Sequence, residues 1–271
     1  MTAFETFHQA QRQRVSDGQC YPLCFDCRSP QPLMIVLWPQ LGDFDSLEYA
    51  FWLQRESEKI QALHLQVRAV GIGNRQAGQR FCEFTGFPAD WLYLDPQAEL
   101  HQQVGLYPGL RLKLPGLSAA QAAGVNLMLM CAGVGSPGTI KEVLRGYTGD
   151  RSAPQLIADE AVIQASPLPP LKGRLFARAG GTGFQRPFEL ATLRLRNMGE
   201  VLSHWQTYVP DASLLTQRGG TFVYGPQRQL LYEHRDRGLL GFAKQMARPL
   251  EFLDSLPGLR PRPSPGDPSR V

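Results

Sequence analysis

The stretch LMIVLWPQLGDFDSLEYAFWL, residues 33–53, decides the fold. It opens with an apolar run, Leu33–Trp38, that is typical of a buried strand. A short turn at 39–45 follows, and then a helix begins whose apolar face carries Leu47, Ala50, Phe51 and Leu53. A helix N-terminus offers free N–H groups and a positive dipole end, which lower the pKa of a thiol or bind an anion. This turn contains no cysteine, and the question of function follows from that absence.

Length and charge exclude several classes of protein. The chain has 271 residues, enough for one large domain or two small ones, and a net charge of +4. Part of that charge lies in the last residues, and no basic block is interleaved with aromatics, so we expect no nucleic-acid partner. The most apolar window, Val125–Val134, is about half the ~20 residues that a spanning helix needs, so we expect no transmembrane segment. No apolar signal opens the chain, and its five cysteines are an odd number. These features indicate a cytoplasmic protein with free thiols and without a cofactor.

Residues 33–105 alternate between strand and helix patterns. After the first strand and helix, a second strand is expected at 65–74 and a helix at Arg75–Thr85, with Asn74 and Gly86 at its ends. A third strand at 91–95 and a short helix at Ala98–Val104 complete the series. Such alternation predicts an α/β fold with parallel strands joined by right-handed crossovers.

The pattern changes between residues 106 and 217, which we interpret as a large, mostly helical insertion that caps the sheet. The segments expected to be helical there are Leu117–Cys131, Ile140–Arg145 and Phe188–Tyr208. Strand patterns return at Thr221–Tyr224 and Leu230–Glu233 and predict a β-hairpin. A last amphipathic helix is expected over Leu239–Leu253, with a kink at Pro249.

The two ends of the chain lie outside this domain, which we place at 30–255. Residues 1–29 are expected to form a short helix, Phe4–Val15, and an irregular loop that contains Cys20, Cys24 and Cys27. Residues 256–271 are rich in proline and charge and predict a disordered tail.

The residues of the hairpin and of the insertion resemble a known family. TFVYGPQRQLLYEHRD, residues 221–236, resembles the closing hairpin of the AhpC/TSA peroxiredoxin-like family, which has a thioredoxin fold with a central mixed sheet. NLMLMCAGVGSPGTIKEVLRGYTGD, residues 126–150, is similar to a helix and Gly-rich turn of the prostamide-synthase-like branch. Residues 41–56 and 193–210 further resemble a cyanobacterial and plastid subgroup.

The resemblance implies that the turn at 39–45 corresponds to a redox site. In that branch the helix start carries a Gly-Cys-x-x-Cys motif, and here Gly42 matches the glycine while Asp43 and Ser46 stand at the two cysteines. Neither side chain can form a sulfenic acid or a disulfide. Asp45 with Glu48 instead fits a capping box, worth about 1 kcal/mol. We therefore interpret Gly42, Asp43, Asp45 and Ser46 as a redox site turned into a structural helix start.

Other residues remain as candidates for chemistry. Cys24 and Cys27 have the C-x-x-C spacing of a dithiol or of half a metal site, but a second pair for zinc is missing, so we expect no metal site. Cys82 lies beside two phenylalanines and is expected to be a buried structural cysteine. Asp43, Asp45 and Glu48 could bind a divalent cation, although capping explains them more simply.

Two functions follow. In the first, the chain has lost its peroxidatic thiol and binds a protein partner through the insertion, and the resemblance implies a role in assembly of photosynthetic machinery at a cytoplasmic or thylakoid-peripheral location. Peripheral contact with a membrane is left open. In the second, the chain is a thiol-dependent antioxidant oxidoreductase that uses Cys24 and Cys27, or Cys82.

Overall fold

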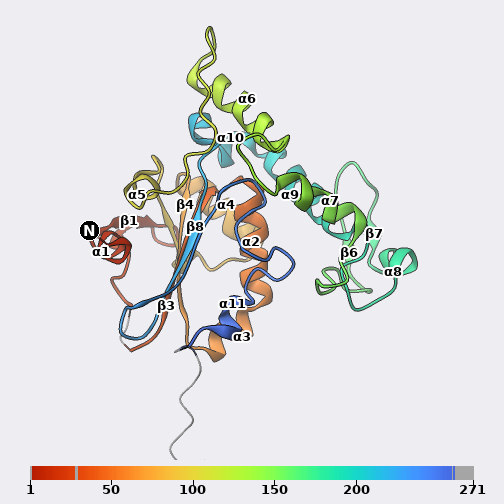
Figure 1. The fold of residues 1–271 in the computed structure, drawn as a ribbon, viewed down its shortest axis with the longest axis horizontal. Helices are drawn as coiled ribbons and strands as arrows, with labels where there is room; N and C mark the ends of the chain where they lie inside the picture. Colours follow the sequence, from red (N-terminus) through yellow and green to blue (C-terminus); the bar gives the residue numbers. More distant parts are fainter. Residues whose placement is uncertain (1, 28–29, 258, 260–271) are drawn as a thin grey trace, which may run out of the picture.

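The computed structural model describes residues 2–27, 30–257 and 259, and it is built on a seven-stranded sheet (Figure 1). The strands lie in the order β2-β1-β5-β4-β3-β8-β9. Their bounds are β1 (Gln11–Arg14), β2 (Cys20–Pro22), β3 (Leu33–Gln40), β4 (Gln66–Ile72), β5 (Leu92–Leu94), β8 (Gly220–Tyr224) and β9 (Leu230–Arg235). β3, β4 and β5 are parallel, while the other pairs are antiparallel. This mixed sheet flanked by helices confirms the predicted thioredoxin-like α/β fold, and the predicted hairpin is present as β8 and β9.

Strand β3 is buried along its whole length and divides the core into two layers. Met34, Val36 and Trp38 point to one face of the sheet, while Leu33, Ile35 and Leu37 point to the other. The first face is covered by α2 (Phe44–Arg55), α3 (Ser57–Ala62) and α4 (Arg75–Thr85), and the second by α1 (Ala3–Gln9) and α5 (Glu99–Gln103) (Figure 1). Burial on both faces explains why this strand reads as a continuous apolar run.

The insertion packs on the helical layer and extends away from the sheet (Figure 1). Its helices are α6 (Ala119–Cys131), α7 (Thr139–Thr148), α8 (Arg174–Gly180), α9 (Glu189–Ser203) and α10 (Trp205–Tyr208). A small hairpin, β6 (Val162–Ile163) with β7 (Leu171–Lys172), and two 3-10 turns, η1 (Ala89–Trp91) and η2 (Ala212–Leu214), complete the elements before β8. Helix α9 packs against α2, and α10 packs against α4. The expected cap over the sheet is therefore wrong, because the insertion covers helices instead.

The sequence prediction also fails at both ends of the chain. The first helix ends at Gln9, and the residues that follow form β1, which pairs with β5 from much later in the chain. The expected helix over Leu239–Leu253 is irregular, and only α11 (Phe252–Ser255) is helical. Leu239 instead exchanges hydrogen bonds with Ser136 and Thr139 beside α7, and Leu240 takes a positive φ. Most of the expected tail at 256–271 lies outside the described residues.

Candidate functional site

The turn between β3 and α2 is held by its own polar side chains. Asp43 is the N-cap of α2, and its Oδ1 accepts a hydrogen bond of 2.9 Å from the Asp45 N–H. The Ser46 hydroxyl donates to the Gln40 carbonyl at 2.9 Å. The cap is thus Asp43 and not Asp45, and Glu48 pairs with Arg194 at 2.8 Å, so the expected capping box is wrong. Asp43 and Ser46 both tie the helix start to the backbone.

A buried arginine joins the turn to strand β8. The Arg218 guanidinium is fully buried and donates to Asp43 at 2.7 Å and to Asp45 at 3.3 Å. It also donates to the Thr216 carbonyl at 3.0 Å. Arg218 stands directly before Gly219, where a Cβ would lie 2.2 Å from the Leu37 carbonyl oxygen of β3. Glycine therefore lets the two strands approach, and the approach places Arg218 over the helix start.

The carboxyl groups around Arg218 have unequal acidities. Burial, with the charge of Asp43 beside it, raises the pKa of Asp45 well above its ordinary value despite the nearby Arg218. Burial likewise raises the pKa of Asp236 to about 8, although Arg218 and the Gly219 backbone lower it in part. Among the described residues, Oδ1 of Asp236 has no hydrogen-bond partner. We conclude that Arg218 is neutralised chiefly by Asp43.

The insertion packs against this turn. Asp45 and Ser46 are buried, and a Cβ on Gly42 would lie 2.7 Å from the Cβ of Tyr208 on α10. Tyr208 in turn donates to Glu200 at 3.1 Å, and Glu200 pairs with Arg80 of α4 at 2.6 Å. Helix α10 therefore packs against the turn, and Asp45 and Ser46 are removed from solvent.

The acidic residues of the turn do not form a cation site. Asp43 and Asp45 face Arg218, and Glu48 faces Arg194, so each carboxylate already has a cationic partner. In the part of the chain that the structure describes, no group of three or more His, Cys, Asp or Glu side chains is arranged to hold a metal. The cation alternative is therefore wrong for these three residues.

Cys24 and Cys27 lie together in one tight turn after β2. The Cys27 N–H donates to the Cys24 carbonyl at 3.1 Å, which is the closure of a β-turn. Such a turn keeps the two Cα atoms within about 7 Å, near the range that a disulfide spans. A hydrogen bond from the Cys24 thiol lowers the pKa of Cys27, and the charge of Arg68 lowers it further against the effect of burial. The two thiols therefore differ in acidity, with Cys27 the more acidic of the pair.

The sheet separates this dithiol from the other candidates. Cys24 and Cys27 pack against the core under α1 and α5, whereas Cys82 packs against the opposite core under α2 and α4. Burial raises the pKa of Cys82 to about 12, which makes its thiol inert at neutral pH. The structure thus brings Cys24 and Cys27 together and places both Cys82 and the Asp43–Ser46 turn on the other face.

Arg218 could not be predicted as part of the site, because it lies 175 positions after its partner Asp43. A lone arginine before two glycines at a strand start is the only signal that could have pointed to it. The capping role of a residue such as Asp43 can be predicted, because a capping side chain bonds to the backbone of its own sequence neighbours.

Comparison with known proteins indicates the family of the chain. A family model described as AhpC/TSA antioxidant enzyme matches residues 52–238, more than half of the chain. The match begins inside α2 and so includes Cys82, Arg218 and the closing hairpin, but neither Asp43 nor Cys24 and Cys27. No curated protein matches the chain. Within the residues described, no helix is long and apolar enough to cross a membrane.

Proposed function

Because the chain belongs to the AhpC/TSA antioxidant enzyme family, we propose that it is a peroxiredoxin-like protein that has lost thiol chemistry at its helix start and works as a non-catalytic binding or assembly module. Asp43 and Ser46 would stand at the positions of the two cysteines. We assign it to the prostamide-synthase-like branch and its cyanobacterial and plastid subgroup, in the cytoplasm or at the thylakoid periphery.

The observation that carries this proposal is the closed network around Arg218. A peroxidatic site needs a thiolate that a hydroperoxide can reach. Here the positions that we assign to the two cysteines hold a capping carboxylate paired with Arg218 and a hydroxyl that donates to the backbone. Side chains in these roles stabilise a helix start and have no redox chemistry.

The insertion offers a surface for a protein partner. Ile140, Leu144 and Tyr147 recur at helical spacing along α7, and with Phe188 they form what we call the α7 face, each residue more than half exposed. The Tyr147 and Phe188 rings pack edge to face with centroids 6.2 Å apart, beside a hollow of about 350 Å³. Large exposed apolar groups gathered in one place are typical of an interaction surface.

A capture experiment in the native cell tests this surface. We expect the wild-type protein to retain a partner that the variant Leu144→Asp/Tyr147→Asp loses, because charge in an apolar interface is costly. Leu175→Asp is the matched control, since Leu175 of α8 is exposed but lies outside the α7 face. An unchanged set of captured proteins in the double variant would refute the proposal for this face.

A second function is favoured by the Cys24–Cys27 turn. In this alternative, the Cys27 thiolate attacks a hydroperoxide, forms a sulfenic acid and releases an alcohol, and Cys24 then closes the disulfide with loss of water. The test is the rate of alkylation by iodoacetamide as a function of pH. This alternative requires Cys27 to react at a lower pH than an unperturbed thiol does and Cys24→Ser to shift that profile upward, with Cys82→Ser as the inert control.

A further inference from the structure

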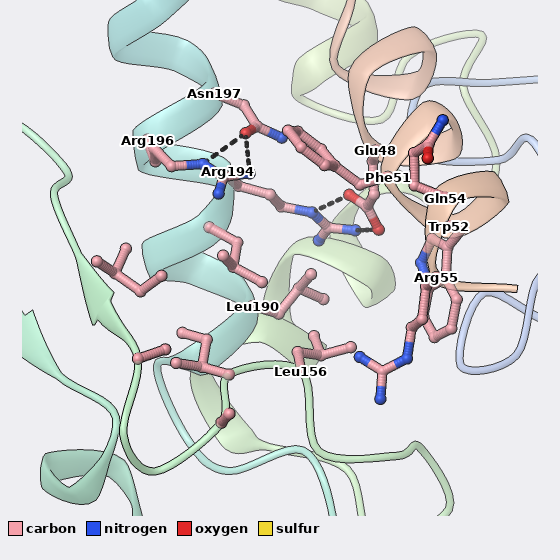
Figure 2. A pocket seen from close by; sticks show the side chains of 15 residues that line it. Glu48, Phe51, Trp52, Gln54, Arg55, Leu156, Leu190, Arg194, Arg196 and Asn197 are labelled. Atoms are coloured by element: carbon pink, nitrogen blue, oxygen red, sulfur yellow. Dashed lines mark hydrogen bonds and ion pairs between the residues drawn. The ribbon is translucent and has the colours of Figure 1, made fainter. Parts of the chain in front are cut away.

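A pocket lies between α2, the segment 156–163 and α9 (Figure 2). Its volume is about 460 Å³, within the size range of small-molecule sites. Trp52, Leu156 and Leu190 belong to its apolar wall. The ion pair between Glu48 and Arg194 crosses one side of it, with Nε–Oε2 and Nη2–Oε1 distances of 2.8 and 3.1 Å (Figure 2).

The charges of this pocket are not balanced. Three arginines and one glutamate line it, and Arg194 is already paired with Glu48. Arg55 donates to the Gln155 carbonyl at 2.6 Å, and Arg196 donates to the Asn197 side-chain oxygen at 2.9 Å. Among the described residues, neither of these two guanidinium groups forms an ion pair with a carboxylate. The lining thus carries an excess of positive charge beside an apolar wall.

Aromatic rings orient the Arg196 side chain, although no carboxylate is paired with it among the described residues. Its guanidinium lies 4.4 Å from the centroid of the Phe51 ring and 5.5 Å from that of Phe84. Burial lowers the pKa of Arg196, whereas Arg194, which has two carboxylate partners, has a raised pKa. An orienting aromatic contact and an unmet charge are what a preorganised anion site requires.

We propose that this pocket binds an organic anion that joins an apolar body to a single carboxylate. The apolar body would lie against Leu156 and Leu190, and the carboxylate would accept hydrogen bonds from Arg196 or Arg55. A neutral ligand of the same shape would leave the guanidinium charge unmet, and a cation would be repelled. This inference is independent of the proposed loss of thiol chemistry, because the pocket contains no cysteine.

Calorimetric titration of the full chain with decanoate tests the proposal. We expect saturable binding below the concentration at which decanoate forms micelles, and at least tenfold weaker binding of decanol and of decyltrimethylammonium. Arg196→Gln should weaken decanoate binding about tenfold, because a charge-assisted hydrogen bond is lost. Arg55→Gln should also weaken decanoate binding, and because Arg55 is exposed at the rim of the pocket, the variant should remain folded.

Two further variants decide between the pocket and a nonspecific surface. Ala161→Phe fills the pocket and should abolish binding, while Arg178→Gln removes an exposed arginine of α8 outside it and should leave binding unchanged. Circular dichroism checks that each variant is folded. Equal binding of decanoate and decanol, or wild-type affinity in both Ala161→Phe and Arg55→Gln, would overturn the proposal.

Discussion

At the scale of single residues, Arg218 organises the start of α2. It is buried, pairs with Asp43 and Asp45, and lies two residues before β8, the strand beside β3. Because its guanidinium is buried and faces two carboxyl groups, its contribution differs from that of a surface arginine. A buried charge that loses its partner is strongly destabilising, whereas a surface pair contributes little.

Replacement of Arg218 should therefore be severe. We expect Arg218→Gln to lower the free energy of unfolding by about 3–5 kcal/mol, since Asp43 would remain as a buried carboxylate without a cation. Urea unfolding measures the loss. Arg178→Gln, on the exposed side of α8, should stay within about 0.5 kcal/mol of wild type. A similarly small effect of Arg218→Gln would contradict the assigned role.

Asp236 makes stability depend on pH in an unusual direction. Its pKa is about 8 in the folded chain, against about 3.9 for an unfolded aspartate. Between these values the folded state holds a proton that the unfolded state has released. The free energy of unfolding should thus fall as pH rises from about 4 to about 8, by at most about 1.4 kcal/mol per pH unit.

The variant Asp236→Asn isolates this contribution. The asparagine cannot ionise, so the decline of the free energy of unfolding between pH 5 and pH 8 should become shallower. The decline should not vanish, because Asp45 also has a raised pKa in the folded chain. Urea midpoints at four pH values give the slope. A slope equal to that of wild type would show that Asp236 is ionised at neutral pH.

At the scale of elements, α9 connects the insertion to the sheet's helical layer through charge. Arg194 pairs with Glu48 of α2 and with Glu142 of α7, and Glu200 pairs with Arg80 of α4. The two pairs of Arg194 are largely shielded from water, so they interact more strongly than exposed ones. They fix the orientation of α9 on α2, and that orientation places α10 over Gly42.

A double-mutant cycle on Glu48→Gln and Arg194→Gln measures this connection. We expect a coupling free energy of about 1–3 kcal/mol, because both groups are buried and the pair is bidentate. The exposed pair Glu160 and Arg174 is the control, with an expected coupling below about 1 kcal/mol. Equal coupling in the two pairs would mean that α9 is held by apolar packing alone.

Local signals explain which elements could be predicted. Helix α4 was predicted with its Asn74 cap and its left-handed Gly86 end, since both act within one turn of chain. Strand β1 could not be predicted in this way, because its pairing with β5 depends on residues about eighty positions later. The segment 239–251 has the apolar spacing of a helix face and its apolar residues are buried, but the Leu239 backbone bonds to Ser136 and Thr139 and the segment is irregular.

The site follows the same division between local and distant contacts. The capping role of Asp43 could be predicted from residues 42–46, whereas its pairing with Arg218 could not. The pocket beside Arg196 was equally invisible, because α2 and α9 contribute to it from distant parts of the sequence. Contacts between such segments depend on the tertiary fold and leave no periodic pattern.

At the scale of the whole molecule, the sheet separates two regions of different chemistry. One face carries the closed turn, the insertion and the positively charged pocket, and the other carries the Cys24–Cys27 turn. Loss of redox chemistry on the first face would therefore leave the second free to keep thiol reactivity. The family membership is compatible with either outcome, since the match excludes both the Asp43 turn and the two cysteines.

The central claim is that the helix start of this AhpC/TSA protein no longer reduces peroxides. Its most direct test is consumption of hydrogen peroxide and of an organic hydroperoxide, with dithiothreitol as electron donor, by wild type and by Cys24→Ser/Cys27→Ser. The account predicts that neither protein consumes hydroperoxide above the rate of the donor alone. Turnover that persists in the double variant would contradict it, whereas turnover that the double variant loses would place the reaction at the Cys24–Cys27 turn.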